Sequence, residues 1–139
     1  MSAPAAAVQS TGDTAGRLTT REFFDGVREG RLVVQRCAAC GALAVPPKAV
    51  CPECEGESWS RTALGGDGEV TSYTVIRVPP ARLAAEAPYV VAVIRMAEGV
   101  SLLGRLTGAP VDAVQVGMRV RFAGSLANAD PPVIAFRPR

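Results

Sequence analysis

The chain has 139 residues, of which 48% are hydrophobic and 20% are charged. This length and composition are typical of one medium-sized globular domain or two small ones, and they do not fit a disordered chain. Fifteen basic against thirteen acidic residues give a net charge of +2, without the clear basic excess expected of a nucleic-acid-binding protein. No apolar run approaches the roughly 20 residues that cross a bilayer, so we expect no membrane association.

The N-terminal residues, 1–16, are rich in alanine, serine, threonine and glycine and contain almost no large apolar side chain. This composition predicts a disordered tail. The segment has neither the basic start nor the continuous apolar run of an export signal, so we expect a cytoplasmic protein. In that compartment cysteine thiols stay reduced and are available to bind metal.

The first predicted element is a short helix. Thr19 and Glu22 have the spacing of a capping box, in which each side chain accepts a hydrogen bond from the other residue's backbone N–H. The helix is expected to run to about Glu29 and to end at Gly30. Its apolar side carries Phe23, Phe24 and Val27.

The four cysteines are the most informative residues. They form two matched pairs, Cys37-x-x-Cys40 and Cys51-x-x-Cys54, in a chain without histidine. Two such pairs with a short spacer place four thiolates at the corners of a tetrahedron, which predicts a zinc ribbon. Because all four coordination positions would be sulfur, we expect one structural Zn²⁺ per chain with no open position for catalysis.

Two other interpretations of the cysteines are weaker. A thioredoxin-type redox site would have a single pair at the start of a helix, and Pro46, Pro47 and Pro52 argue against a helix after either pair. Two disulfides would require export to an oxidising compartment. A glycine lies just beyond each pair, and we expect Gly41 and Gly56 to adopt the positive φ of a tight turn.

Short strands are predicted on both sides of a glycine-rich boundary at residues 65–68. Ribbon strands are expected at 31–36, 42–45 and 58–63, and later strands at 70–78, 89–96, 101–106, 119–123 and 133–137. Five strands in about 70 residues favour an OB-fold barrel, although residues 108–116 are too few for the helix that many OB-folds carry. The prediction is a mainly β chain with a tail at 1–16, a helix and rubredoxin-like ribbon at 17–64, and a five-stranded barrel at 65–139.

The order of helix, ribbon, glycine boundary and barrel resembles the zinc-ribbon/OB-fold family of acyl-CoA-associated proteins. The resemblance covers about residues 19–137. It is carried mainly by the runs Phe23-Phe24-Asp25-Gly26-Val27, Gln35-Arg36-Cys37-Ala38-Ala39-Cys40-Gly41, Cys51-Pro52-Glu53-Cys54 and Gly66-Asp67-Gly68-Glu69-Val70-Thr71-Ser72. Two positions depart from the family pattern, because Phe24 stands where tryptophan or tyrosine is common and Lys48 where arginine often follows the proline.

The resemblance implies a non-catalytic accessory subunit. Members of the family associate with thiolase-superfamily enzymes, with lipid-transfer-protein-like aldolases or with hot-dog-fold enoyl-CoA hydratases. The implied role is to bind and brace a thiolase-like or aldolase-like enzyme that acts on acyl-CoA, and to help line the passage of the acyl-CoA. The composition agrees, because the chain has no histidine for proton transfer and no cysteine that zinc would leave free.

Two further sets of residues are candidates for binding. The apolar helix residues Phe23, Phe24 and Val27 either pack inside the protein or dock onto the partner. Arginines of the barrel, chiefly Arg77, Arg95 and Arg105, either meet the phosphates of coenzyme A or form a solvated outer face. The alternative function is a nucleic-acid-binding OB-fold, but the aromatic side chains that would stack on bases, Tyr73 and Phe122, lie in apolar runs typical of a core.

Overall fold

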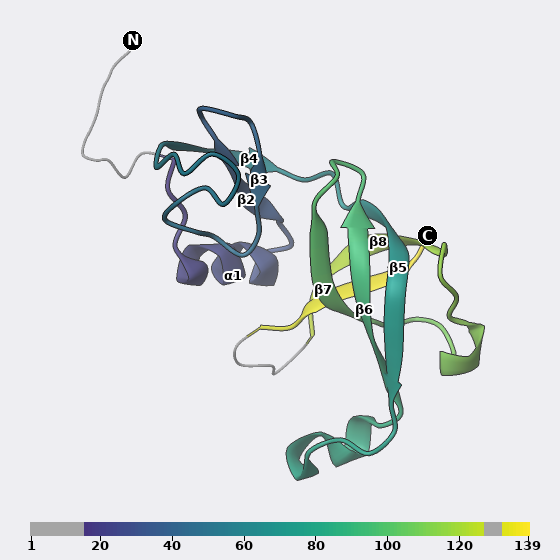
Figure 1. Ribbon diagram of the computed structural model, residues 1–139. Coiled ribbons are helices and arrows are strands. Elements are labelled where there is room, and N and C mark those ends of the chain that lie inside the picture. The colour runs from purple at the N-terminus through teal and green to yellow at the C-terminus, as the bar shows by residue number, and fades with distance from the viewer. Residues whose placement is uncertain (1–15, 127–131) are drawn as a thin grey trace. The chain divides into compact units, whose positions relative to one another are not determined.

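The computed structural model describes residues 16–126 and 132–139 (Figure 1). The predicted tail, apart from Gly16, lies outside the described residues. The chain forms two compact units, of which one includes Arg31–Leu64 and the residues up to Gly26. The other consists of Val27–Gly30 and Gly65–Arg139. Each unit is described below by itself.

The helix α1 (Thr20–Arg28) is capped at both ends as the sequence predicts. The Glu22 N–H donates to Thr19 Oγ1 and the Thr19 N–H donates to Glu22 Oε1, both at 3.0 Å, which forms the capping box. At the other end Gly30 has a φ of 83°. The Gly30 and Arg31 N–H groups then bond back to the carbonyls of Val27 and Gly26, which is a Schellman stop.

The first unit contains a small antiparallel sheet with the order β3-β2-β4. Its strands are β2 (Val33–Cys37), β3 (Leu43–Ala44) and β4 (Trp59–Ala63). All three predicted ribbon strands are therefore present, and each is shorter than expected. Gln35 lies in the middle, opposite Ala44 on one side and Arg61 on the other. The two connections that carry the cysteines, from β2 to β3 and from β3 to β4, therefore begin and end in this sheet.

The second unit is a closed five-stranded barrel with the order β5-β6-β7-β9-β8. Its strands are β5 (Asp67–Ile76), β6 (Tyr89–Met96), β7 (Ser101–Leu106), β8 (Arg119–Ser125) and β9 (Ile134–Pro138). Strands β7 and β9 pair in parallel and close the barrel, and the other pairs are antiparallel. The predicted fold class is confirmed.

Apolar side chains fill the interior of the barrel, and glycines allow the closest approaches. Phe136 and Ile94 are fully buried. A Cβ at Gly104 would lie 2.7 Å from the Phe136 ring, and one at Gly68 would lie 2.6 Å from Ile94 Cγ2. Gly68 is therefore a strand residue of β5 and not part of a hinge, which corrects the end of the predicted glycine boundary.

The described residues of the barrel unit contain two 3₁₀ helices, η2 (Ala81–Glu86) and η3 (Val111–Ala113). The three residues of η3 occupy the position where many OB-folds carry a longer helix, as the short connection predicts. Figure 1 shows the teal η2 segment at the far end of the β5–β6 hairpin, away from β8 and β9. The hairpin thus projects beyond the body of the barrel.

Candidate metal centre

The ribbon sheet brings the four predicted cysteines together. Cys37 is the last residue of β2, and the second pair lies in the connection between β3 and β4. Cys37 and Cys51 are buried, whereas Cys40 and Cys54 are exposed. All four thiols are free. Their Sγ atoms lie within 4.8 Å of one another.

The spacing of the sulfurs fits a tetrahedral metal site. The Cys37 and Cys54 sulfurs are 3.5 Å apart, and those of Cys40 and Cys51 are 3.7 Å apart. Zn–S bonds of about 2.3 Å at tetrahedral angles place sulfurs about 3.8 Å apart. A disulfide would instead bring two sulfurs to about 2.05 Å. The donor set and its spacing therefore match a four-cysteine zinc site.

The two knuckles have the same backbone hydrogen bonds. The N–H of Gly41 donates to the Cys37 carbonyl at 2.9 Å, and the N–H of Glu55 donates to the Cys51 carbonyl at 2.8 Å. Each turn then closes on its first cysteine, whose own N–H donates to the carbonyl of Ala42 or Gly56 at 2.8 Å. This repeat presents each pair of sulfurs on one side of its turn.

The expected role of Gly56 is wrong. Positive φ occurs at Gly41, at 81°, and at Glu55, at 65°, which is the corresponding position of the second knuckle. Gly56 instead lies against the metal site, because a Cβ there would be 3.3 Å from the Cys54 sulfur and 3.6 Å from the Cys37 sulfur. The sequence spacing alone did not distinguish a turn requirement from a packing requirement.

Polar anchors support the ribbon from behind the cysteines. The Trp59 indole N–H donates to the Ala49 carbonyl at 3.0 Å, and its ring packs in the core cluster with Cys37 and Cys51. Gln35 is fully buried. Its Oε1 accepts the Lys48 backbone N–H at 2.7 Å, while its Nε2 has no hydrogen-bond partner in the described part of the chain.

The thiols differ in their affinity for protons before a metal binds. The Cys40 backbone N–H is the main cause that lowers the pKa of Cys37 to about 6. The Gly56 backbone N–H acts in the same direction on Cys54, but the neighbouring sulfurs of Cys37 and Cys40 raise the pKa of Cys54 to about 12. A Zn²⁺ ion at the centre would displace the remaining protons, because it binds the thiolate form.

The apolar helix residues are not equally available to a partner. Phe23 and Val27 are buried within the chain, at 2% and 0% exposure. Phe24 is half-buried, and its ring packs edge-on against Phe23 with the centroids 5.1 Å apart. Internal packing therefore accounts for Phe23 and Val27, and the docking prediction depends on Phe24.

The three predicted coenzyme A arginines lie in different surroundings. Arg77 and Arg95 are exposed. Arg105 is only 8% exposed, its Nη1 lies 2.8 Å from Glu86 Oε1, and its guanidinium lies 3.8 Å above the centre of the Tyr89 ring. Arg105 thus belongs neither to a solvated outer face nor to an open anion site. Sequence reasoning missed the Glu86 and Tyr89 partners, because nothing in their spacing links them to β7.

Arg95 lines a surface hollow of about 490 Å³ in the barrel unit. Two carboxylates line the same hollow and pair with its arginines, with Arg139 Nη1 3.7 Å from Asp67 Oδ2 and Arg119 Nε 3.9 Å from Glu69 Oε1. Asp67 Oδ1 also accepts a hydrogen bond from Arg121 Nε at 3.0 Å. The Arg121 hydrogen bond is the main cause that lowers the pKa of Asp67. The hollow therefore contains charges of both signs.

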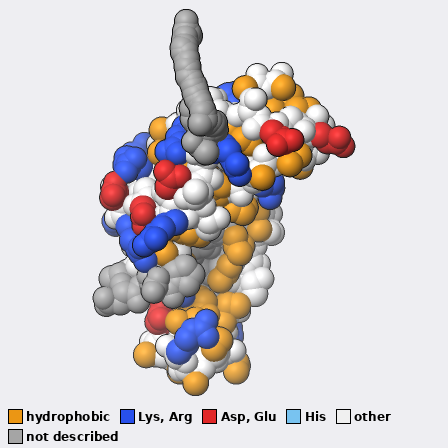
Figure 2. Space-filling model, turned by 90° about the vertical axis from the view of Figure 1, so that its left-hand side faces the viewer, with side chains coloured by type: hydrophobic (Ala, Val, Ile, Leu, Met, Phe, Trp, Pro, Cys, Tyr) orange, Lys and Arg blue, Asp and Glu red, His pale blue; other side chains and the backbone are white. Residues whose placement is uncertain are grey.

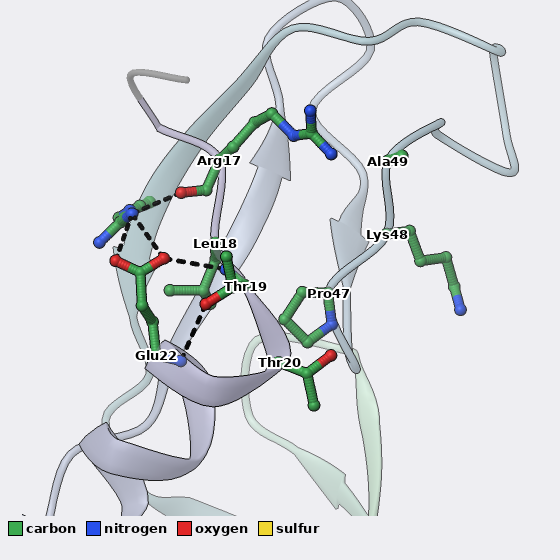
Figure 3. A pocket seen from close by; sticks show the side chains of 9 residues that line it. Arg17, Leu18, Thr19, Thr20, Glu22, Pro47, Lys48 and Ala49 are labelled. Atoms are coloured by element: carbon green, nitrogen blue, oxygen red, sulfur yellow. Dashed lines mark hydrogen bonds and ion pairs between the residues drawn. The ribbon is translucent and has the colours of Figure 1, made fainter. Parts of the chain in front are cut away.

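Another hollow, of about 510 Å³, lies in the ribbon unit beside the start of α1. Figure 3 shows Thr19 and Glu22 joined on one side of it, while the Lys48 side chain points away from them. Glu22 is also paired with Arg61 at 3.2 Å, and Arg61 Nη2 donates to the Arg17 carbonyl. These groups satisfy one another and do not converge on a ligand.

Two family models match the chain one after the other. The rubredoxin-like zinc ribbon domain of ChsH2 matches residues 24–60, and the C-terminal OB-fold domain of ChsH2 matches residues 61–124. A DUF35 domain-containing scaffold protein of Methanocaldococcus jannaschii is 33% identical over 108 residues, which are 76% of this chain and 77% of the relative. The chain belongs to the DUF35 family. The resemblance inferred from the cysteine and glycine runs is thereby confirmed.

Other relatives of this DUF35 chain are much longer. It is 39% identical to a probable enoyl-CoA hydratase alpha subunit of Thermomonospora curvata, over 84% of this chain and 36% of the relative. It is 36% identical to the 3-oxo-4,17-pregnadiene-20-carboxyl-CoA hydratase alpha subunit of Mycobacterium tuberculosis, over 73% of this chain and 32% of the relative. The chain thus spans about a third of the length of each.

Solved structures share the two-unit DUF35 fold. A chain of the Ltp2-ChsH2(DUF35) aldolase matches with a TM-score of 0.75 and 38% identity, over 86% of this chain and 93% of that chain. A DUF35-family protein of unknown function from Sulfolobus solfataricus matches with a TM-score of 0.62 at 21% identity, over 86% and 84% of the two chains, which supports the fold alone. Within residues 16–126 and 132–139, no helix is long and apolar enough to cross a membrane.

Proposed function

We propose that this DUF35 chain is a non-catalytic accessory subunit that binds and braces an enzyme acting on acyl-CoA. The observation that carries the proposal is the match to a chain of the Ltp2-ChsH2(DUF35) aldolase, at 38% identity over 93% of that chain. It favours an aldolase-like partner over a thiolase-like one. The scaffold name of the M. jannaschii relative supports a role in assembly.

The side chains available also favour an accessory role. The chain contains no histidine, which is the side chain that most often transfers protons near neutral pH. All four cysteines belong to one cluster, so zinc would leave no free thiol for nucleophilic attack. The partner would therefore supply the groups that react with the acyl-CoA.

One Zn²⁺ per chain, held by Cys37, Cys40, Cys51 and Cys54, is part of this proposal. Four sulfur ligands close the coordination sphere, so the ion supplies folding stability and no reaction site. The sulfur spacing of 3.5 and 3.7 Å supports this assignment. The residues of the chain fix the two knuckles through backbone N–H groups, and the ion would lock the knuckles to each other.

A hydratase partner is the second candidate. Two relatives are named hydratase alpha subunits, and this chain matches about a third of each. Arg95 remains the proposed contact to the phosphates of coenzyme A, because it is exposed and guanidinium groups suit phosphate oxygens. The partner's identity decides which chemistry the complex performs.

The test is to purify the tagged chain from its native cell under mild conditions and to identify the proteins bound to it. We expect a stoichiometric acyl-CoA aldolase, thiolase or hydratase subunit, and cleavage or hydration of acyl-CoA by the complex but not by the chain alone. Recovery of a zinc-loaded chain with no such subunit would contradict the proposal. Salt-sensitive binding to a labelled oligonucleotide would favour the alternative OB-fold function.

A further inference from the structure

The connection between β5 and β6, residues 77–88, is an exposed apolar projection, which we call the tip segment. Eight of the ten residues from 78 to 87 are valine, leucine, proline or alanine. Val78 is 93% exposed, and no residue of η2 is buried. At the lower end of the view in Figure 2, where the tip segment lies, hydrophobic side chains surround a basic one. Such a surface at the end of a hairpin contributes nothing to the barrel core.

Prolines and local hydrogen bonds restrict the backbone of the tip segment despite its exposure. Pro79, Pro80 and Pro88 restrict its backbone at both ends. Within it, the Leu83 N–H donates to the Pro80 carbonyl at 2.9 Å and the Ala87 N–H donates to the Ala84 carbonyl at 3.4 Å. An apolar surface with a restricted backbone loses less conformational entropy when it is buried against a partner.

Arg105 anchors the tip segment to the barrel wall. It lies on β7 opposite Val91 of β6, and its guanidinium contacts Glu86 at the end of η2 and the ring of Tyr89 at the start of β6. Burying a guanidinium costs solvation, and removing it in favour of an apolar side chain is often neutral for stability. A buried arginine at this position is therefore better explained by orientation of η2 than by stability of the barrel.

The charges of the tip segment indicate what kind of surface it fits. Arg77 and Arg82 are exposed, whereas the one acidic residue, Glu86, is paired with Arg105. The complementary surface is an apolar groove whose rim carries carboxylates. A lipid surface fits less well, because membrane-binding segments insert large aromatic or leucine-rich faces, and this segment offers one leucine and no aromatic residue.

We propose that the tip segment is a docking element of this subunit, which enters an apolar, acid-rimmed groove of the acyl-CoA enzyme, and that Arg105 is the residue that positions it. The inference rests on the proposed accessory function and names the surface through which part of the complex forms. Val78 is the central contact and Arg105 acts only through the orientation of η2. The assignment also removes Arg105 from the residues that contact coenzyme A.

The experiment compares full-length variants for binding to the purified partner subunit, measured by calorimetry. Val78→Asp is expected to weaken binding at least tenfold with zinc content and thermal unfolding unchanged. Val116→Asp is the matched control, because Val116 is also a highly exposed valine of the barrel unit, at 64%, and should change binding less than twofold. Arg105→Met should weaken binding severalfold alone but add little to Val78→Asp, since both act on one contact.

Each outcome decides the question. Equal binding by Val78→Asp and Val116→Asp would overturn the tip assignment while leaving the accessory function in place. A wild-type chain that binds no acyl-CoA enzyme would overturn both. A wild-type dimer that Val78→Asp dissociates, or binding to phosphatidylserine vesicles that the same variant abolishes, would assign the tip segment to self-association or to a membrane and overturn the proposal.

Discussion

The Sγ atoms of Cys37 and Cys54 lie 3.5 Å apart although the two residues are seventeen positions apart in the chain. One cysteine ends a strand of the ribbon sheet and the other lies in a loop, so the loop must fold back onto the strand. The sulfurs supply little attraction for one another in the absence of a cation. A metal ion is the interaction that would hold them together, and this dependence can be measured.

Cys40→Ser should release the zinc and unfold the ribbon. Structural zinc binding contributes roughly 10–16 kcal/mol in small zinc-finger peptides, and Cys40 supplies one of the four sulfurs. We expect metal content to fall from one atom per chain to none, as measured by atomic absorption. Ala39→Ser is the control, because it adds the same hydroxyl to the same knuckle at an exposed position. Full zinc retention by Cys40→Ser would rule out the assigned ligand set.

The two knuckle glycines should respond differently to alanine. Gly41 has a positive φ with open space around it, so Gly41→Ala should lower the free energy of unfolding by about 1 kcal/mol with zinc affinity retained. A methyl group at Gly56 would press on the Cys54 sulfur, so Gly56→Ala should weaken zinc binding by about tenfold or more. Competition with a chelator measures both affinities. Equal affinities in the two variants would mean that the sulfurs shift freely.

The capping box makes stability depend on pH. The Thr19 backbone N–H is the main cause that lowers the pKa of Glu22 below 4.5 in the folded chain. The stabilisation is therefore present above pH 4.5 and is lost as the pH falls through the folded pKa. Glu22→Gln should be less stable than the wild type at pH 7, and the difference should shrink below pH 4. Denaturant unfolding at several pH values measures it, and a constant difference would contradict the assignment.

Alanine substitutions of the two phenylalanines of α1 should affect different properties, one mainly the stability of the chain and the other mainly its binding to the partner. Phe23 is 2% exposed, so Phe23→Ala should lower the free energy of unfolding by about 3–5 kcal/mol. Phe24 is half-buried, so Phe24→Ala should cost less stability but weaken the complex with the acyl-CoA enzyme. Thermal unfolding and calorimetric binding distinguish the two effects. If the Phe24 variant binds as the wild type does, that ring is part of the internal packing only.

Local chemistry accounts for the features that the sequence predicted well. The capping box at Thr19, the Schellman stop at Gly30 and the cysteine knuckles each depend on a few neighbouring residues, whose backbone bonds close within five positions. The barrel strands were recognisable because apolar residues alternate between turn signals, and β6 and β7 have the expected bounds. Such signals are complete within one short segment of the chain.

Packing between distant segments determined the features that the sequence did not predict. Gly68 lies against Ile94 and Gly104 against Phe136, and in both cases the reason for the glycine is a neighbour that its own strand does not contain. Tyr73 was expected in the core but is 38% exposed. From the sequence, Arg105 could not be distinguished from an outward-facing strand residue. In the folded barrel it contacts Glu86 and Tyr89. A short segment specifies its own backbone bonds, but only the closed sheet determines which side chains meet across it.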